Sequence, residues 1–278
     1  MTKSVATPAV EPPMPRPVGS GREEAQARIR RFLDLEQPAT PCLVIDLETV
    51  RERYTAISSA LPGVGVFYAV KANPEPEVVG LLAAEGCSFD VASPAEIDLC
   101  LAQGAPAERI SYSNPIKKAA DVAYAFGRGV RLFVSDSEQD VRAIAEHAPG
   151  SAVLLRIFVS ANKSTYPFGK KFGCDPEMAT DLLRLASRLG LRALGVAFHA
   201  GSQQLDPHGW DSAIADAGAI TAKLRNRLRA VMISSTTPSA KYSCSAPPLM
   251  LLNGRTASDG SRSFVASMEP NTPGSREP

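Results

Sequence analysis

Short, mostly apolar segments recur along the chain at a regular spacing, and this rhythm constrains the fold more than any other feature. They lie at residues 64–70, 88–92, 110–113, 131–135, 152–159 and 193–199. The first five are centred about 21 to 23 residues apart. Helix-like patterns occupy residues 75–85, 94–103, 117–126, 138–147 and 176–189. Nearly all-apolar strands that alternate with helices indicate an α/β protein with a parallel sheet.

Two α/β architectures fit this rhythm, a doubly wound sheet and a (β/α)8 TIM-type barrel. A dinucleotide-binding doubly wound sheet is expected to carry G-x-G-x-x-G after its first strand. Residues 64–70 are instead followed by Lys71-Ala72-Asn73. We therefore predict a barrel over residues 37–224, incomplete because about six β/α repeats are recognisable.

The ends of the chain differ in composition from these repeats. Residues 1–36 are expected to form a disordered leader, rich in Pro, Ala and Val, and a helix at 22–35. A strand is predicted at 42–47, and helices at 48–61 and 206–223. Of the 54 residues in 225–278, 23 are Ser, Thr, Pro or Gly. We expect this tail to be disordered or non-native, either a low-complexity tail or the product of a frameshift or truncation after about residue 224.

Charge and cysteine content exclude several classes of function. The net charge is +1, with 30 basic and 29 acidic residues, and no basic stripe suggests nucleic-acid binding. No run of 18 apolar residues predicts a membrane-spanning helix. The five cysteines are scattered, odd in number and without a CxxC pair. This usage argues against a metal site or disulfide framework and favours the cytoplasm.

Polar residues recur where the apolar segments end. They are Lys71, Asp90, Asn114, Asp136, Arg156 and His199, with Ser202 shortly after. Taken singly, such an aspartate could cap a helix, the arginine could lie at a strand edge, and the histidine could be a hydrogen-bonded core residue. Unpaired burial of several charged groups would be costly. A shared site at the carboxyl-end mouth of a barrel explains them together.

The residue types fit pyridoxal phosphate (PLP) chemistry. A desolvated lysine forms a Schiff base with an aldehyde, which makes Lys71 the candidate anchor. The His199 imidazole could stack on the pyridine ring, and the Ser202 hydroxyl could bond the phosphate. Asp90 and Arg156 would hold polar groups in register beside the lysine.

Five ordered motifs carry a resemblance to a known family. They are Tyr68-Ala69-Val70-Lys71-Ala72-Asn73, Phe89-Asp90-Val91-Ala92-Ser93, the run Glu108 to Lys118, Lys171-Phe172-Gly173 and Gly195-Val196-Ala197-Phe198-His199-Ala200-Gly201-Ser202. Over about residues 37–224 the chain resembles the barrel domain of the ornithine/diaminopimelate/arginine decarboxylases, which have an alanine-racemase-like fold. Residues 40–47 and 110–118 are most similar to the ornithine decarboxylases of that family.

The resemblance implies PLP as cofactor and no metal. It implies Lys71 and His199 as catalytic residues, and Lys71, Asp90, Arg156, His199 and Ser202 as cofactor-binding residues. It places Glu96 in the neighbourhood of the active site and Lys171 near a dimer interface, although a helix-surface glutamate and a solvated loop lysine are the plain alternatives. The implied reaction is decarboxylation of a small basic amino acid, foremost L-ornithine to putrescine in polyamine biosynthesis, with lysine or diaminopimelate as alternatives. The implied assembly is a homodimer.

The chain also departs from the family pattern. A Gly-Gly-Gly phosphate loop, a Glu-Pro-Gly-Arg segment and the C-terminal β-domain are expected in the family and are missing from this sequence. Without these parts an inactive remnant that binds PLP weakly, or pairs with an intact relative, is the alternative to an enzyme. A barrel of six strands would also leave the first and sixth strands with open edges.

Overall fold

The structure is a computed structural model that describes residues 20–159, 171–202, 208–224, 230–236, 251–253 and 264–269. The chain divides into two compact units, Met1–Thr49 and Val50–Pro278. Most of the predicted leader and residues 160–170 lie outside the described residues. The domain boundaries at residues 36 and 224 remain predictions.

The first unit contains helix α1 (Ser20–Glu36) and the start of helix α2 (Leu47–Ala60), which confirms both predicted helices. The strand predicted at 42–47 is wrong. Residues 42–46 have no regular structure, and Leu43 is 86% exposed. The apolar run lacks a strand partner within the described residues, and its last polar residue, Asp46, bonds instead to the first turn of α2.

Asp46 joins the two helices of this unit by its side chain. Arg28 on α1 donates from Nε to Asp46 Oδ1 at 3.0 Å and from Nη2 to Oδ2 at 2.7 Å. The Thr49 backbone N–H and hydroxyl donate to Asp46 Oδ2 at 3.2 and 2.6 Å. Asp46 thus caps α2, and a bidentate guanidinium holds it in place. The Arg28 hydrogen bond lowers the pKa of Asp46 from 3.8 to about 2, against the opposing effect of burial.

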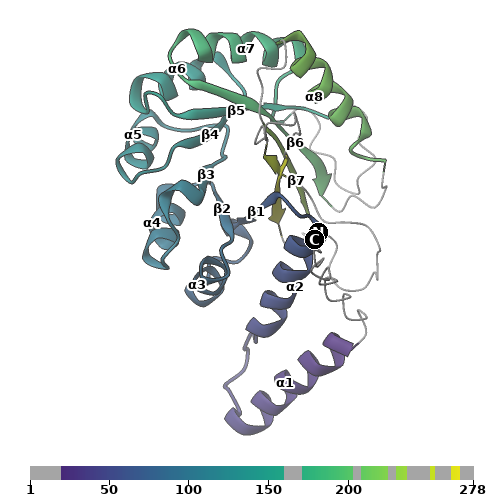
Figure 1. Cartoon of the computed structure of the whole chain (residues 1–278). Helices are drawn as coiled ribbons and strands as arrows, with labels where there is room; N and C mark the ends of the chain where they lie inside the picture. The colour runs from purple at the N-terminus through teal and green to yellow at the C-terminus, as the bar shows by residue number, and fades with distance from the viewer. Residues whose placement is uncertain are drawn as a thin grey trace, which may run out of the picture. The chain divides into compact units, whose positions relative to one another are not determined.

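The second unit is a barrel built mainly of parallel strands (Figure 1). Its first six strands are β1 (Val64–Ala69), β2 (Ser88–Val91), β3 (Ile110–Tyr112), β4 (Leu132–Ser135), β5 (Ala152–Ile157) and β6 (Arg192–Ser202). Each pairs in parallel with the next. These strands confirm the six predicted from the apolar segments.

Helices alternate with the strands and lie on the outer side of the curled sheet, as Figure 1 shows for α4 to α7. They are α3 (Pro76–Ala84), α4 (Pro94–Ala102), α5 (Ala119–Gly127), α6 (Glu138–His147), α7 (Pro176–Arg188) and α8 (Asp211–Lys223), with a short 3₁₀ turn η2 (Ala107–Arg109) before β3. Ser93, Ser137 and Asp175 accept backbone N–H groups at the starts of α4, α6 and α7. These caps fix where each helix begins after its strand or loop.

The tail that is expected to be disordered or non-native contains three strands in its described residues. They are β7 (Ala230–Thr236), β8 (Leu251–Asn253) and β9 (Phe264–Glu269). The backbone of β7 pairs in parallel with β6, and β9 pairs in parallel with both β7 and β1. The ring is therefore closed, and the predicted open edges of the first and sixth strands are also wrong. The predicted incomplete barrel of the (β/α)8 type is confirmed: six β/α repeats are present, from β1–α3 to β6–α8, and no helix follows α8 in the described part of the chain.

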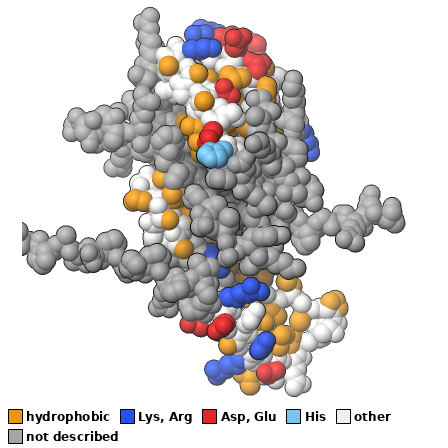
Figure 2. Space-filling view, turned by 90° about the vertical axis from the view of Figure 1, so that its right-hand side faces the viewer, with side chains coloured by type: hydrophobic (Ala, Val, Ile, Leu, Met, Phe, Trp, Pro, Cys, Tyr) orange, Lys and Arg blue, Asp and Glu red, His pale blue; other side chains and the backbone are white. Residues whose placement is uncertain are grey.

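The buried core of the second unit is mostly apolar, and the surface carries charges of both signs. Tyr112, Phe89, Phe133 and Phe198 are among the largest fully buried side chains. On the face seen in Figure 2, basic and acidic side chains neighbour each other, which fits the net charge of +1. None of the helices in the described residues is long and apolar enough to cross a membrane.

A buried ion pair stabilises the barrel near the carboxyl ends of its strands. The Lys117 side chain is fully buried, and its Nζ donates to Asp140 Oδ2 at 2.7 Å, to the Val134 carbonyl at 2.7 Å and to the Asn114 carbonyl at 2.9 Å. Burial lowers the pKa of Lys117 and raises that of Asp140, while each charge favours the ionised form of the other. Three acceptors around one ammonium compensate for its removal from water.

The bidentate pair in the first unit predicts a pH dependence. Asp46 is ionised in the folded unit down to about pH 2, so the pair stabilises the fold above pH 4 and this contribution is lost as the pH falls toward 2. We expect Arg28→Ala to raise the pKa of Asp46 toward 3.8, measured by NMR titration of its carboxyl carbon. Arg30→Ala, on a different face of α1, is the control, and an unchanged pKa in Arg28→Ala would contradict this assignment.

The buried pair predicts an asymmetric mutant series. Lys117→Met leaves the Asp140 carboxylate buried without its cation and should lower the free energy of unfolding by about 3–5 kcal/mol, measured by urea denaturation. Lys117→Met combined with Asp140→Leu should lower the free energy of unfolding by less than Lys117→Met alone. The exposed neighbour provides the control, since Lys118→Met should change stability by less than about 0.5 kcal/mol.

Candidate functional site

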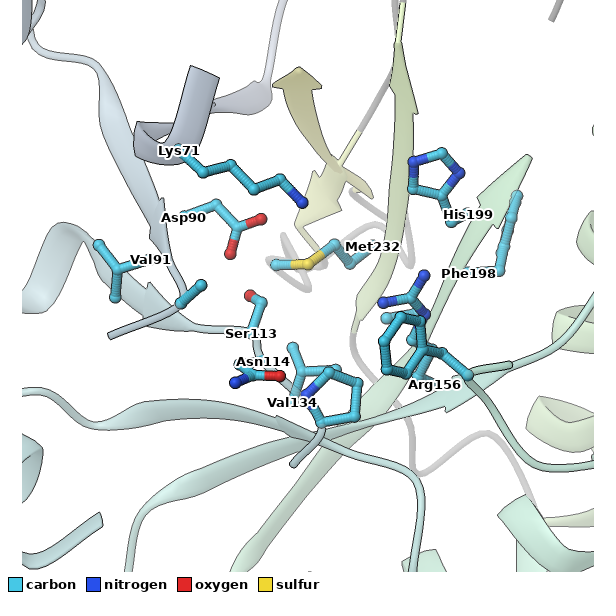
Figure 3. A pocket seen from close by; sticks show the side chains of 14 residues that line it. Lys71, Asp90, Val91, Ser113, Asn114, Val134, Arg156, Phe198, His199 and Met232 are labelled. Carbon is cyan, nitrogen blue, oxygen red and sulfur yellow. The ribbon is translucent and has the colours of Figure 1, made fainter. Parts of the chain in front are cut away.

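A pocket of about 130 Å³ opens at the carboxyl ends of the strands (Figure 3). Residues from β1 to β7 or from the loops that follow them line it: Lys71, Asp90, Val91, Ala92, Ser113, Asn114, Pro115, Val134, Arg156, Phe172, Ala197, Phe198, His199 and Met232. Four of the five predicted cofactor-binding residues therefore share one pocket. The fifth, Ser202, is placed only by its backbone, which pairs with Thr236 at the end of β6.

Lys71 lies in the 3₁₀ turn η1 (Val70–Ala72), directly after β1. Its side chain extends into the pocket, and its amine points to the same space as the Asp90 carboxylate (Figure 3). Lys71 is exposed in the structure. The reason is its position in a turn at the rim, two residues beyond the last residue of β1.

Asp90 is the third residue of β2 and does not cap the helix that follows. Ser93 takes that role, since its Oγ accepts the Glu96 N–H at 3.3 Å. Glu96 in turn reaches back, and its Oε2 accepts the N–H of Ala92, the residue before the N-cap, at 2.6 Å. Burial raises the pKa of Glu96, opposed by the Ala92 hydrogen bond and by the charge of Lys71. Glu96 thus holds backbone that lines the pocket.

His199 is 7% exposed and is held by a local hydrogen bond. The Gly201 N–H donates to His199 Nδ1 at 2.9 Å, at an irregularity of β6 where Gly201 has a φ of +88°. Because Nδ1 accepts, the neutral ring carries its proton on Nε2. The Gly201 hydrogen bond therefore fixes both the orientation of the imidazole and its tautomer.

The remaining predicted residues divide between the pocket and its supports. Asn114 lines the pocket, whereas Asp136 accepts the Gly173 N–H at 2.8 Å and so ties a loop to the end of β4. Arg156 lies inside, and its guanidinium carbon is 5.2 Å from the centre of the Phe172 ring. Lys171 is exposed, with its Nζ 5.1 Å from the same ring.

Several lining residues were not among the predicted site residues, and three of them are instructive. Ser113 directly follows β3, and this strand-end position is the signal that could have identified it. Phe172 lies in a loop, where an apolar residue gives no periodic signal. Met232 comes from β7, in the segment that was expected to lack structure.

The chemistry of this set fits PLP. An amine stands at one side of the pocket, and a carboxylate, a guanidinium and an imidazole converge on the same space. The apolar side chains Val134, Phe198 and Met232 supply surface for an aromatic ring. Lys71, Asp90, Arg156 and His199 are therefore the residues that would hold the cofactor.

Comparisons with known proteins agree with this geometry. Residues 47–231 match the family model for pyridoxal-dependent decarboxylase, pyridoxal binding domain. The lysine/ornithine decarboxylase of Selenomonas ruminantium is 41% identical over 175 residues, which are 63% of this chain and 44% of that protein. The chain thus spans less than half the length of this relative.

Solved structures give the same result. The lysine/ornithine decarboxylase from Vibrio vulnificus, complexed with cadaverine, is 32% identical with a TM-score of 0.66, over 77% of this chain and 56% of that one. SrLDC in complex with PLP and cadaverine is 30% identical with a TM-score of 0.68, over 88% of this chain and 63% of that one. The fold, the pocket and the family model together identify the chain as a member of the PLP-dependent decarboxylases of basic amino acids, with PLP as the cofactor of its barrel domain.

Proposed function

We propose that this chain provides the PLP-binding barrel of a decarboxylase that converts L-ornithine to putrescine and CO₂, a step of polyamine biosynthesis. The convergence of Lys71, Asp90, Arg156 and His199 on one pocket is the observation that carries the proposal. Lysine and diaminopimelate are the alternative substrates. The motif at residues 110–118 favours ornithine, and the Selenomonas relative is named for both lysine and ornithine.

Each residue has a separate role in this proposal. When bound, PLP supplies a ring that accepts the electron pair released as the carboxylate leaves. The Lys71 amine holds the aldehyde end of the cofactor, and the His199 ring stacks on its face in the orientation set by Gly201. Asp90 and Arg156 hold the polar groups of the cofactor beside the lysine. Ser202 donates a hydrogen bond to the cofactor phosphate.

The assembly and location of the whole protein are also part of the proposal. We infer a cytoplasmic homodimer that takes a small basic amino acid, with Lys171 near the contact between subunits. Lys171 is exposed and directly precedes Phe172, which lines the pocket, and this position supports such a role. We further propose that neither nucleic acid nor a membrane is a partner, since the net charge is only +1.

The cofactor assignment is tested by absorbance. Purified 278-residue protein with PLP should show a Schiff-base band at about 420 nm, and Lys71→Ala should abolish it. Lys118→Ala, which removes an exposed lysine outside the pocket, should retain the band. A band that persists in Lys71→Ala would overturn the role of Lys71.

Turnover is tested separately. Carboxyl-labelled ornithine, lysine and diaminopimelate are supplied to the same PLP-loaded protein, and released CO₂ is counted. We expect release from ornithine above the other two, because the motifs favour the ornithine decarboxylases. Faster release from lysine would correct the substrate. A Lys71-dependent band without CO₂ from any of the three would leave a cofactor-binding protein and refute the decarboxylase.

A further inference from the structure

Phe172 lies in a loop, and the two residues that follow it, Gly173 and Cys174, are hydrogen-bonded to two neighbouring strands or their ends. The Cys174 N–H donates to the Arg156 carbonyl at 2.9 Å, and the Phe158 N–H donates to the Cys174 carbonyl at 3.1 Å. These bonds make a parallel bridge between Cys174 and Ile157. The Asp136 carboxylate, at the end of β4, accepts the Gly173 N–H at 2.8 Å. We call this arrangement of residues 172–174 the latch.

Glycine is required at the centre of the latch. Gly173 has a φ of +95°, which side chains of L-residues rarely adopt. A Cβ there would also lie 2.7 Å from the Ile157 carbonyl carbon and from the Phe158 nitrogen. Both restrictions arise because the loop backbone packs directly on the end of β5. This close packing holds the backbone directly after Phe172 against the end of β5, and the Phe172 side chain lines the pocket.

The ring that the latch places faces two cations. The Arg156 guanidinium carbon lies 5.2 Å from the ring centre and the Lys171 Nζ lies 5.1 Å from it. Both distances are within the range of cation–π attraction. Arg156 and Phe172 line the same pocket, whereas Lys171 is exposed. The ring is therefore within cation–π distance of one cation in the pocket, Arg156, and one exposed cation, Lys171.

We propose that Phe172 is a positioning residue for Arg156: the latch presents the ring, and the ring face holds the guanidinium in the pocket for the cofactor. The inference rests on the proposed function, because it assigns Arg156 to the PLP site. Phe172 itself needs no contact with the cofactor for this role. The loop thereby couples the end of β4, through Asp136, to a side chain of β5.

Three variants of the full chain separate a ring face from simple packing. PLP affinity is measured by titrating the band at about 420 nm. Phe172→Leu keeps an apolar side chain but removes the π face, and we expect it to weaken PLP binding about 10-fold. Phe172→Tyr keeps the face and should stay within about 2-fold of the unmodified chain. Phe172→Ala should be at least as weak as Phe172→Leu.

A double-mutant cycle tests whether the effect passes through Arg156. In an Arg156→Gln background, Phe172→Leu should weaken PLP binding by less than about 2-fold, because the guanidinium that the ring holds is no longer present. Thermal unfolding followed by circular dichroism checks that each variant is folded. The remote control is Tyr124→Leu, which removes an exposed aromatic ring from the surface of α5 and should not change PLP affinity.

The outcomes distinguish the inference from the function on which it rests. If the unmodified chain shows no Lys71-dependent band, the proposed function and the inference fall together. If that band is present and Phe172→Leu binds PLP as well as the unmodified chain, only the inference is overturned. Equal weakening by Leu and Tyr would also overturn it, because packing rather than the ring face would then be responsible. Should Arg156→Gln bind no PLP, the comparison of Leu with Tyr decides.

Discussion

The parallel pairing of β1 to β7 is the constraint on which the site depends, because it sets the carboxyl ends of all these strands at one rim. The register fixes which side chains become neighbours. Ala69 is opposite Asp90, so Lys71, two residues beyond Ala69, emerges beside the Asp90 carboxylate. Arg156 is opposite Ala197, so His199 stands two residues further along the adjacent strand. A slip of one residue would turn these groups to the other face of the sheet.

Charged side chains, buried or half-buried, then hold the loops that follow the strands. Glu96 bonds the backbone at Ala92, Lys117 bonds the Asn114 and Val134 carbonyls, and Asp136 bonds the backbone of the latch. Each contact joins a charged group to backbone that lines or borders the pocket. Charged groups are costly to bury unless they are bonded, so these contacts also select one loop conformation over others. The rim of the pocket is thus held by polar contacts as much as by packing.

The sequence was sufficient for features that repeat locally and insufficient for those that depend on distant partners. The six strands and their helices were predicted because apolar periodicity is visible within ten or twenty residues. The strand at 42–47 failed because an apolar run forms a strand only where another strand accepts it. Strand β9 was missed for the converse reason, since its partner β1 lies about 200 residues earlier in the chain. The sequence places Lys71 at the rim correctly. It does not indicate how exposed the side chain is, because that depends on the turn η1.

The apolar floor of the pocket explains why a few charged groups are enough to hold a bound ligand. Val134, Ala197 and Met232 are at most 5% exposed and lie beneath the polar rim. Apolar surroundings lower the local dielectric constant and strengthen each interaction between the pocket charges and a bound ligand. A ligand that fits must therefore combine an apolar ring with charged or polar groups at its edges. Pyridoxal phosphate has this composition, with a ring for the floor, an aldehyde for Lys71 and charged groups that the rim can hold.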